Sequence, residues 1–161
     1  MTGIDTAKAE RRRLRFNSID EVLAEVDRIV AAEKAGRLRR TGNWTAGQVL
    51  GHLATWIEYA YTGYPMRVPW FIRFLIRRKL PAMLRDGMQA GVRIPKVEGG
   101  TYGTEDVSID EAAKRLRAAL DRMKREPPRH HSPAFGPMSD EDRVTLNLRH
   151  AELHLGFLHP Q

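Results

Sequence analysis

Residues 139–155, SDEDRVTLNLRHAELHL, combine a helix start signal with two imidazoles. Ser139 is followed three residues later by Asp142, the spacing at which a hydroxyl and an acid cap the free N–H groups of a first helical turn. Apolar residues then recur at helical spacing, which predicts a single amphipathic helix. His150 and His154 stand four residues apart, so both rings lie on one side of it.

The two sides of this helix differ in composition. One arc is polar and is expected to face solvent; it holds Glu141, Asp142, Thr145, Arg149, Glu152 and Gly156. The opposite arc, flanked on both sides by apolar residues, holds Arg143, Asn147, His150 and His154. Both histidines are therefore predicted at the centre of the buried face. A neutral imidazole buried without a partner costs about 1–3 kcal/mol, so a reason for its burial is needed.

Three further capping pairs occur upstream: Ser18 with Glu21, Thr45 with Gln48, and Ser108 with Glu111. Each precedes an apolar pattern of helical period, and no run alternates with period two, so no strands are predicted. Together they indicate an all-α fold, a four-helix bundle whose second and third helices are joined by a long crossover link over residues 61–107. Within this link, VPWFIRFLIRRKLPAMLRDGM (residues 68–88) predicts an extra helix. We expect a single domain over residues 1–161.

Composition excludes several classes of protein. The 161 residues include no cysteine, so disulfides and thiolate metal ligands are absent. No run reaches the roughly 18 apolar residues of a membrane span, and the N-terminus lacks the apolar core of a secretory signal, so we expect a cytoplasmic location. The net charge is +7, but the basic residues form scattered short clusters without a recognition motif, and no nucleic-acid partner is expected.

A third histidine lies on the second predicted helix. His52 falls near the apolar line of Val49 and Trp56, so three imidazoles from two helices can meet inside the bundle. Three histidine ligands leave at least one position of a divalent ion open, as in catalytic rather than structural sites. Zinc, nickel and iron all suit these ligands. The alternative is that His52, His150 and His154 are ordinary core histidines with hydrogen-bond partners.

Four other side chains are candidates for supporting a metal or contacting a substrate: Gln48, Asn147, Arg143 and His131. Gln48 also has a capping role, and Asn147 is either a partner of the site or a plain polar side chain. Arg143 either holds an anionic group or points outward at the rim. His131, in a proline-rich loop, is either an exposed turn residue or an extra ligand or proton shuttle.

Two motifs resemble the DinB-like superfamily of metal-binding four-helix bundles. They are TGNWTAGQVLGHLA (residues 41–54) and HSPAFGPMSDEDRVTLNLRHAELHLGFL (residues 131–158). The chain looks most like a bacterial branch known only as a domain of unknown function, and the similarity spans nearly its whole length. The resemblance implies that His52, His150 and His154 bind a divalent metal. Some members of the superfamily resemble thiol S-transferases that use bacillithiol or mycothiol, and others are known only to bind metal.

Two functional hypotheses follow. The first is a metal-dependent enzyme, a transferase or hydrolase, that acts on a small molecule or a low-molecular-weight thiol. No carboxylate that could act as a general base faces inward, since Glu58 lies opposite His52, and this favours thiol transfer over hydrolysis. The second is a non-catalytic metal-binding or interaction protein that uses the basic apolar segment Trp70 to Lys79 for partner or membrane-surface contact. For that segment we expect a cover over one end of the bundle or a homodimer interface.

Overall fold

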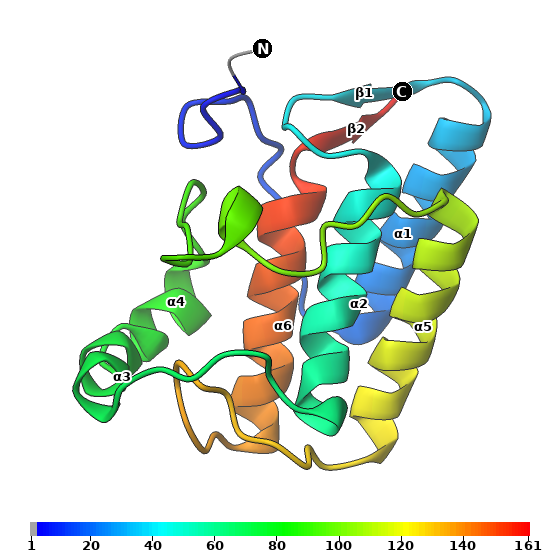
Figure 1. The fold of residues 1–161 in the computed structure, drawn as a ribbon. Helices are drawn as coiled ribbons and strands as arrows, with labels where there is room; N and C mark the ends of the chain where they lie inside the picture. Colours follow the sequence, from blue (N-terminus) through cyan, green and yellow to red (C-terminus); the bar gives the residue numbers. More distant parts are fainter. Residues whose placement is uncertain (1–2) are drawn as a thin grey trace.

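The computed structural model describes residues 3–161 and places the predicted helices side by side (Figure 1). They are α1 (Ile19–Lys34), α2 (Ala46–Thr62), α5 (Ile109–Arg125) and α6 (Asp140–Leu155). α1 and α6 run in one direction and α2 and α5 in the other, so the link from α2 to α5 crosses the length of the bundle (Figure 1). The predicted all-α fold with a crossover link is confirmed.

The predicted caps stand at the start of all four bundle helices. The hydroxyls of Ser18, Thr45, Ser108 and Ser139 each accept a hydrogen bond from the backbone N–H three residues later. At α2 the box is complete, because Gln48 Oε1 also accepts from the Thr45 N–H at 2.9 Å. These caps satisfy N–H groups that have no partner within the helix, so each helix begins where its capping residue stands.

The four helices bury their apolar sides in one core. Its largest fully buried apolar side chains are Val22, Val26, Ile29, Leu50, Leu116, Leu155 and Leu158. Fully burying such a side chain stabilises the fold by about 1.5–3 kcal/mol, so this core is the main source of stability.

The polar arc of α6 faces solvent at its start, where Glu141 is exposed, but its later part does not, contrary to the prediction. Arg149 and Glu152 are only 4% and 8% exposed, because the chain before α1 lies over them. Glu152 Oε1 accepts from the Phe16 N–H at 2.6 Å, and Arg149 Nη2 donates to the Phe16 carbonyl at 2.8 Å. The two side chains also pair with each other at 2.5 Å. Helical periodicity identified the polar side correctly but not the segment that covers it.

A small sheet closes one end of the bundle, so the prediction of no strands is wrong. β1 (Leu38–Arg40) pairs antiparallel with β2 (Leu158–Pro160), directly after α6. Thr41 Oγ1 lies 3.2 Å from Nε2 of His159, which is 8% exposed. Strands of three residues are too short to show a clear alternation of polar and apolar residues.

The crossover link carries two short helices in place of the one predicted: α3 (Trp70–Arg77) and α4 (Leu80–Asp86), followed by the 3₁₀ turn η1 (Glu98–Gly100). Pro81 stands in the first turn of α4. Because proline lacks an N–H and its ring clashes with the carbonyl four residues earlier, one continuous helix cannot pass through it.

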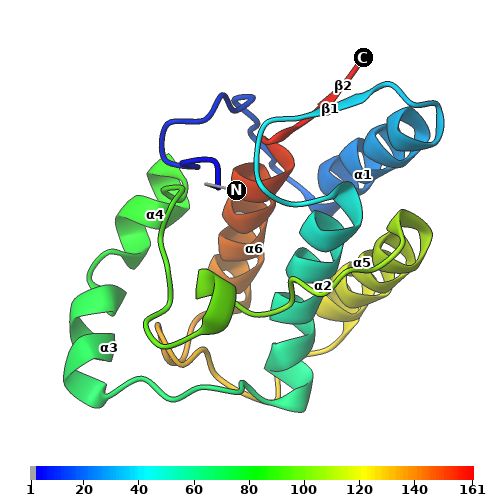
Figure 2. The same ribbon diagram turned by 45° about the horizontal axis from the view of Figure 1, so that its top comes forward.

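The arm formed by α3 and α4 lies beside the bundle: α4 contacts α6 and buries Leu80, whereas α3 stands farther out (Figures 1 and 2). No residue of α3 is buried, so the expectation that this segment covers one end of the bundle is wrong.

None of the described helices is long and apolar enough to cross a lipid bilayer.

Where the link returns to α5, it packs tightly on the start of α2. A Cβ atom added to Gly47 would lie 2.0 Å from the Val107 carbonyl oxygen, whereas one added to Gly51 would meet only a Val107 methyl group at 3.2 Å. Replacing glycine by alanine inside a helix normally raises the free energy of unfolding by about 0.5–1 kcal/mol. We expect Gly47→Ala to reverse this sign and to destabilise the protein by about 1–3 kcal/mol, as overpacking does.

Chemical denaturation of the wild type, Gly47→Ala and Gly51→Ala measures this. Gly51→Ala is the matched control and should stay within about 1 kcal/mol of the wild type, because a side-chain methyl can move aside. Equal or greater stability of Gly47→Ala would show that the link does not press on α2.

Candidate metal centre

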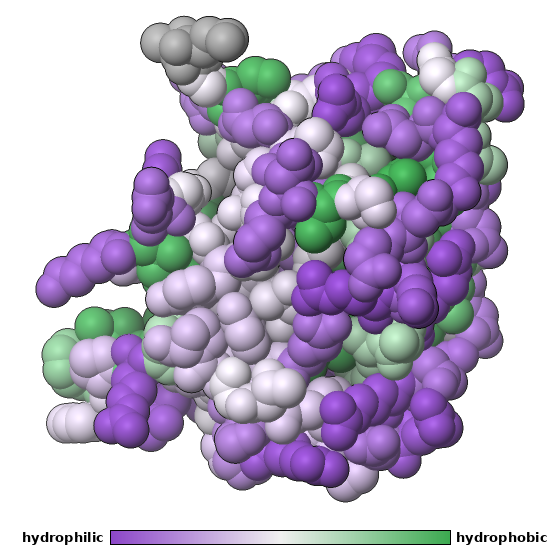
Figure 3. Space-filling model, turned by 45° about the vertical axis from the view of Figure 1, so that its right-hand side comes forward, coloured by the Kyte–Doolittle hydropathy of each residue, from purple (hydrophilic) through white to green (hydrophobic). Residues whose placement is uncertain are grey.

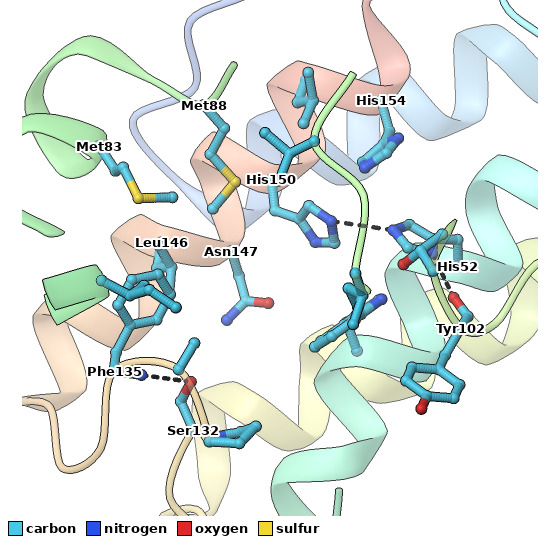
Figure 4. A pocket seen from close by; sticks show the side chains of 18 of the residues that line it. His52, Met83, Met88, Tyr102, Ser132, Phe135, Leu146, Asn147, His150 and His154 are labelled. Carbon is cyan, nitrogen blue, oxygen red and sulfur yellow. Dashed lines mark hydrogen bonds between the residues drawn. The ribbon is translucent and has the colours of Figure 1, made fainter. Parts of the chain in front are cut away.

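Three imidazoles meet beside the bundle core. His52 extends from α2, and His150 and His154 extend from successive turns of α6 (Figure 4). One ring nitrogen from each lies within 4.8 Å of those of the other two. The His52 and His150 Nε2 atoms are 3.1 Å apart. The predicted convergence of three histidines from two helices is confirmed.

The donor set matches a divalent metal ion. Two nitrogens bound tetrahedrally to one ion, with bonds of about 2.0–2.1 Å, lie about 3.3 Å apart. The 3.1 Å between the His52 and His150 nitrogens is close to that separation. His154 offers a third nitrogen in the same group. A four-coordinate ion held by these three ligands has one position left for an exogenous ligand.

A backbone carbonyl sets the tautomer of His52. His52 Nδ1 lies 2.7 Å from the Tyr102 carbonyl oxygen, and because a carbonyl can only accept, Nδ1 carries the proton (Figure 4). The lone pair is then on Nε2, the atom that faces His150. A hydrogen bond from the second ring nitrogen to a carbonyl is how proteins commonly orient a metal-binding histidine.

Tryptophans enclose the histidine rings. Trp44 stacks on His154 with ring centroids 5.2 Å apart and also lies 4.9 Å from His52. Trp56 meets His52 and His150 edge-on at 6.1 and 6.3 Å. These apolar rings exclude water from one side of the group and limit the rotation of the imidazoles.

Burial keeps the three imidazoles neutral. It lowers the pKa of His52 from 6.5 to about 4. Burial, reinforced by the neighbouring histidines, also lowers the pKa of His150 and His154 well below 6.5. Since only a neutral imidazole has a lone pair for a metal, all three are ready to coordinate at neutral pH.

The histidines line one wall of a cleft of about 1960 Å³ between the bundle and the arm. His52 is 2% exposed, but His150 and His154 are only partly buried, because the cleft rather than another helix faces this side of α6. Their predicted burial is therefore confirmed only in part, because one side of each ring faces the cleft. The lining near them is apolar and includes Met83, Met88, Phe135 and Leu146 (Figure 4). A small molecule can therefore approach the histidines through the cleft.

Asn147 and Arg143 lie on the same side of α6 as the histidines and also line the cleft. Asn147 Nδ2 donates to the Arg143 carbonyl at 2.9 Å. Arg143 does not point outward at the rim: it is 7% exposed and donates to Asp140 Oδ1 at 3.1 Å and to the Met123 carbonyl at 3.4 Å. Both side chains thus lie where a cleft ligand could reach them, two and three turns before His154.

Gln48 and His131 lie outside the three-histidine group. Both ends of the Gln48 amide are engaged, one in the α2 cap and the other as a donor to the Thr104 carbonyl at 3.0 Å. Gln48 therefore helps to hold the segment that presents the Tyr102 carbonyl to His52. His131 is exposed and lines the cleft from the loop before α6.

Two parts of this site were missed from the sequence: the Tyr102 carbonyl and Trp44. The carbonyl has no side-chain signal, and its position depends on the path of the crossover link. Trp44 directly precedes the Thr45 cap, and its contact with His154 on α6 depends on how the two helices pack. Trp56, one turn after His52 on α2, lies beside that histidine as helical spacing predicted.

The chain belongs to the family described as "Protein of unknown function (DUF1569)", whose model matches residues 8–161. No curated protein matches the chain, and no solved structure does. Membership in a family of unknown function agrees with the branch predicted from the two motifs, and the wider DinB-like relationship stays a prediction.

The low pKa values of the histidines give the metal-free protein an acid-sensitive stability. The unfolded chain takes up these protons near the ordinary pKa of 6.5, whereas the folded chain resists them. Because the unfolded state then binds more protons, the free energy of unfolding should fall as the pH drops below about 6.5. Each histidine can contribute up to about 1.4 kcal/mol per pH unit.

Denaturation in the presence of a chelator at about pH 7.5 and about pH 5.5 measures this loss of stability. The control is the triple variant His52→Gln, His150→Gln, His154→Gln, whose stability should depend less steeply on pH in this range. Equal slopes for the two proteins would contradict neutral burial of the three rings.

Proposed function

We propose that His52, His150 and His154 hold a divalent metal ion and that the protein is a metal-dependent enzyme acting on a small molecule in the cleft. The observation that carries this proposal is the group of three ring nitrogens within 4.8 Å, one of them aimed by the hydrogen bond to Tyr102. The resemblance to DinB-like bundles supports the same three ligands.

A bound ion with an open position would lower the pKa of a thiol or water molecule there and so supply a nucleophile at neutral pH. The chain itself contributes the neutral nitrogens, the tryptophans that exclude water, and an apolar cleft. Zinc, nickel and iron remain the candidates, because imidazole suits each of them.

We propose thiol transfer as the reaction class, in preference to hydrolysis. Metalloproteases of the H-E-x-x-H type use a carboxylate as general base beside the metal, and within residues 3–161 no carboxylate joins the three-histidine group. Glu58, on the other side of α2, is paired with Arg115 at 2.6 Å. Because a thiol is more acidic than water, coordination to a metal held by the three histidines would leave it as a thiolate at neutral pH, with its proton passing to solvent and without a carboxylate base.

The cleft suggests what the second substrate looks like. Its apolar lining near the histidines suits a small electrophile with an apolar body. Arg143, about 10 Å from His150 along α6 at ~1.5 Å per residue, could hold an anionic group at the far end of such a molecule.

Metal content tests the first part of the proposal. We expect purified untagged wild-type protein to contain about one divalent metal ion per chain, measured by elemental analysis. His52→Ala and His150→Ala should each lower the retained metal by at least about ten-fold, since removing one of three ligands leaves an incomplete site.

The control for metal content is the double variant His130→Ala, His131→Ala, which removes two imidazoles outside the group and should retain the metal. Retention of metal by His52→Ala would refute the assignment. Loss of metal in the control would mean that the loop histidines take part.

Activity tests the second part. Metal-loaded protein, incubated with an aryl or alkyl electrophile and a panel of bacterial thiols, should consume the thiol faster than the metal-free protein does. Arg143→Gln should raise the KM for anionic electrophiles more than for neutral ones, because only the former use the guanidinium. Metal-loaded protein that is inactive toward every thiol would favour the alternative, a non-catalytic metal-binding or interaction protein.

A further inference from the structure

The outer side of α3 is an apolar surface without a partner in the described chain. Its exposed members are Trp70 at 75%, Phe71 at 53%, Phe74 at 58% and Leu75 at 61%. At about 100° per residue these four side chains fall within an arc of roughly 140°. In Figure 3 a small group of hydrophobic side chains projects at the lower left, on the side where α3 lies in Figure 1, next to strongly hydrophilic ones. Contiguous exposed apolar surface of this kind marks an interaction site.

Positive charge surrounds this apolar surface. Residues 59–85 contain no Asp or Glu and six basic residues, all exposed: Arg67, Arg73, Arg77, Arg78, Lys79 and Arg85. Arg85 is paired with Asp86 at 2.7 Å, and Arg77 donates to the Phe135 and Pro137 carbonyls. Within residues 3–161 the other four form no ion pair, so their charge is available to an anionic partner.

A second copy of this chain does not suit the surface. A two-fold contact through α3 would bring two acid-free basic segments together, and like charges brought together in this way oppose association. Apolar side chains ringed by Arg and Lys, with a tryptophan and two phenylalanines, instead match the interface of an anionic lipid bilayer.

We propose that α3 docks the protein on anionic membrane surfaces, with its four outer apolar side chains entering the headgroup region and the basic residues contacting lipid phosphates. The arm projects far enough from the bundle for a flat surface to reach it (Figures 1 and 2). The opposite side of α3, with Ile72 and Ile76, lines the cleft. Docking would therefore place one edge of the cleft beside the membrane.

Vesicle sedimentation tests the proposal. We expect wild-type protein to bind mixed phosphatidylcholine–phosphatidylglycerol vesicles at low ionic strength, to bind pure phosphatidylcholine vesicles weakly, and to lose affinity in high salt. Each basic residue near the surface contributes about five-fold in partitioning, so Arg78→Gln with Lys79→Gln should weaken binding roughly 25-fold. Phe71→Ser with Leu75→Ser should weaken it by at least about ten-fold.

The matched control removes one lysine and one arginine from α5 on the other side of the bundle, through Lys114→Gln with Arg117→Gln. This variant should bind like the wild type; an equal loss there would show attraction by net charge alone and would overturn docking through α3. Fluorescence of the unaltered protein gives a second readout, because the exposed Trp70 should shift to shorter wavelength on anionic vesicles.

Absence of binding to anionic vesicles at low salt would overturn the proposal. So would a dimer in sedimentation equilibrium that the Phe71→Ser, Leu75→Ser variant converts to monomer, because a second copy would then cover α3.

Discussion

The hydrogen bond from His52 Nδ1 to the Tyr102 carbonyl, 2.7 Å long, joins the crossover link to the candidate metal centre. It depends on the close packing of the link along α2. Gly103, at φ +75°, lies so near Thr55 that a Cβ there would come within 2.7 Å of the Thr55 Cβ. Farther along, the Val107 carbonyl fits against Gly47 only because glycine has no side chain. The site thus depends on backbone contacts as much as on the histidines themselves.

That packing decides the chemistry available to the histidines. A proton held on Nδ1 of His52 leaves Nε2 free as a ligand, and the surrounding tryptophans and helices keep all three rings neutral. Without a metal, His52 has the Tyr102 carbonyl and the His150 ring as hydrogen-bond partners, and the burial of the three neutral imidazoles opposes folding in acid. With a metal, each nitrogen gains a strong interaction, so metal binding and folding stability should be linked.

The helices and the three-histidine group were largely predictable from the sequence. Ser18, Thr45, Ser108 and Ser139 each mark a helix start through local hydrogen bonds that short sequence motifs encode. The spacing of His150 and His154, together with His52 on another helix, was enough to predict the convergence. The helix starts are predictable because they follow from local geometry, and the convergence because each histidine lies on the apolar side of its own helix.

Features that depend on contacts between distant segments were not predictable in this way. The covering of Arg149 and Glu152 by the segment at Phe16, the pairing of β1 with β2, and the Tyr102 carbonyl all require the tertiary path of the chain. The exposure of α3 is a similar case, since its apolar residues indicated burial. The break at Pro81 is different, because proline is a local signal that could have divided the predicted helix.

The central claim is that three imidazole nitrogens share one ion, and X-ray absorption at the edge of the bound metal tests it most directly. If the three nitrogens share one ion, the spectrum should show three imidazole ligands, identified by scattering from the outer atoms of their rings. For zinc, the metal–nitrogen distances should be about 2.0–2.1 Å, and one further light atom should complete the coordination. A spectrum dominated by oxygen ligands without ring scattering, or the same spectrum from His150→Ala, would show that the metal is bound elsewhere and would contradict the assignment.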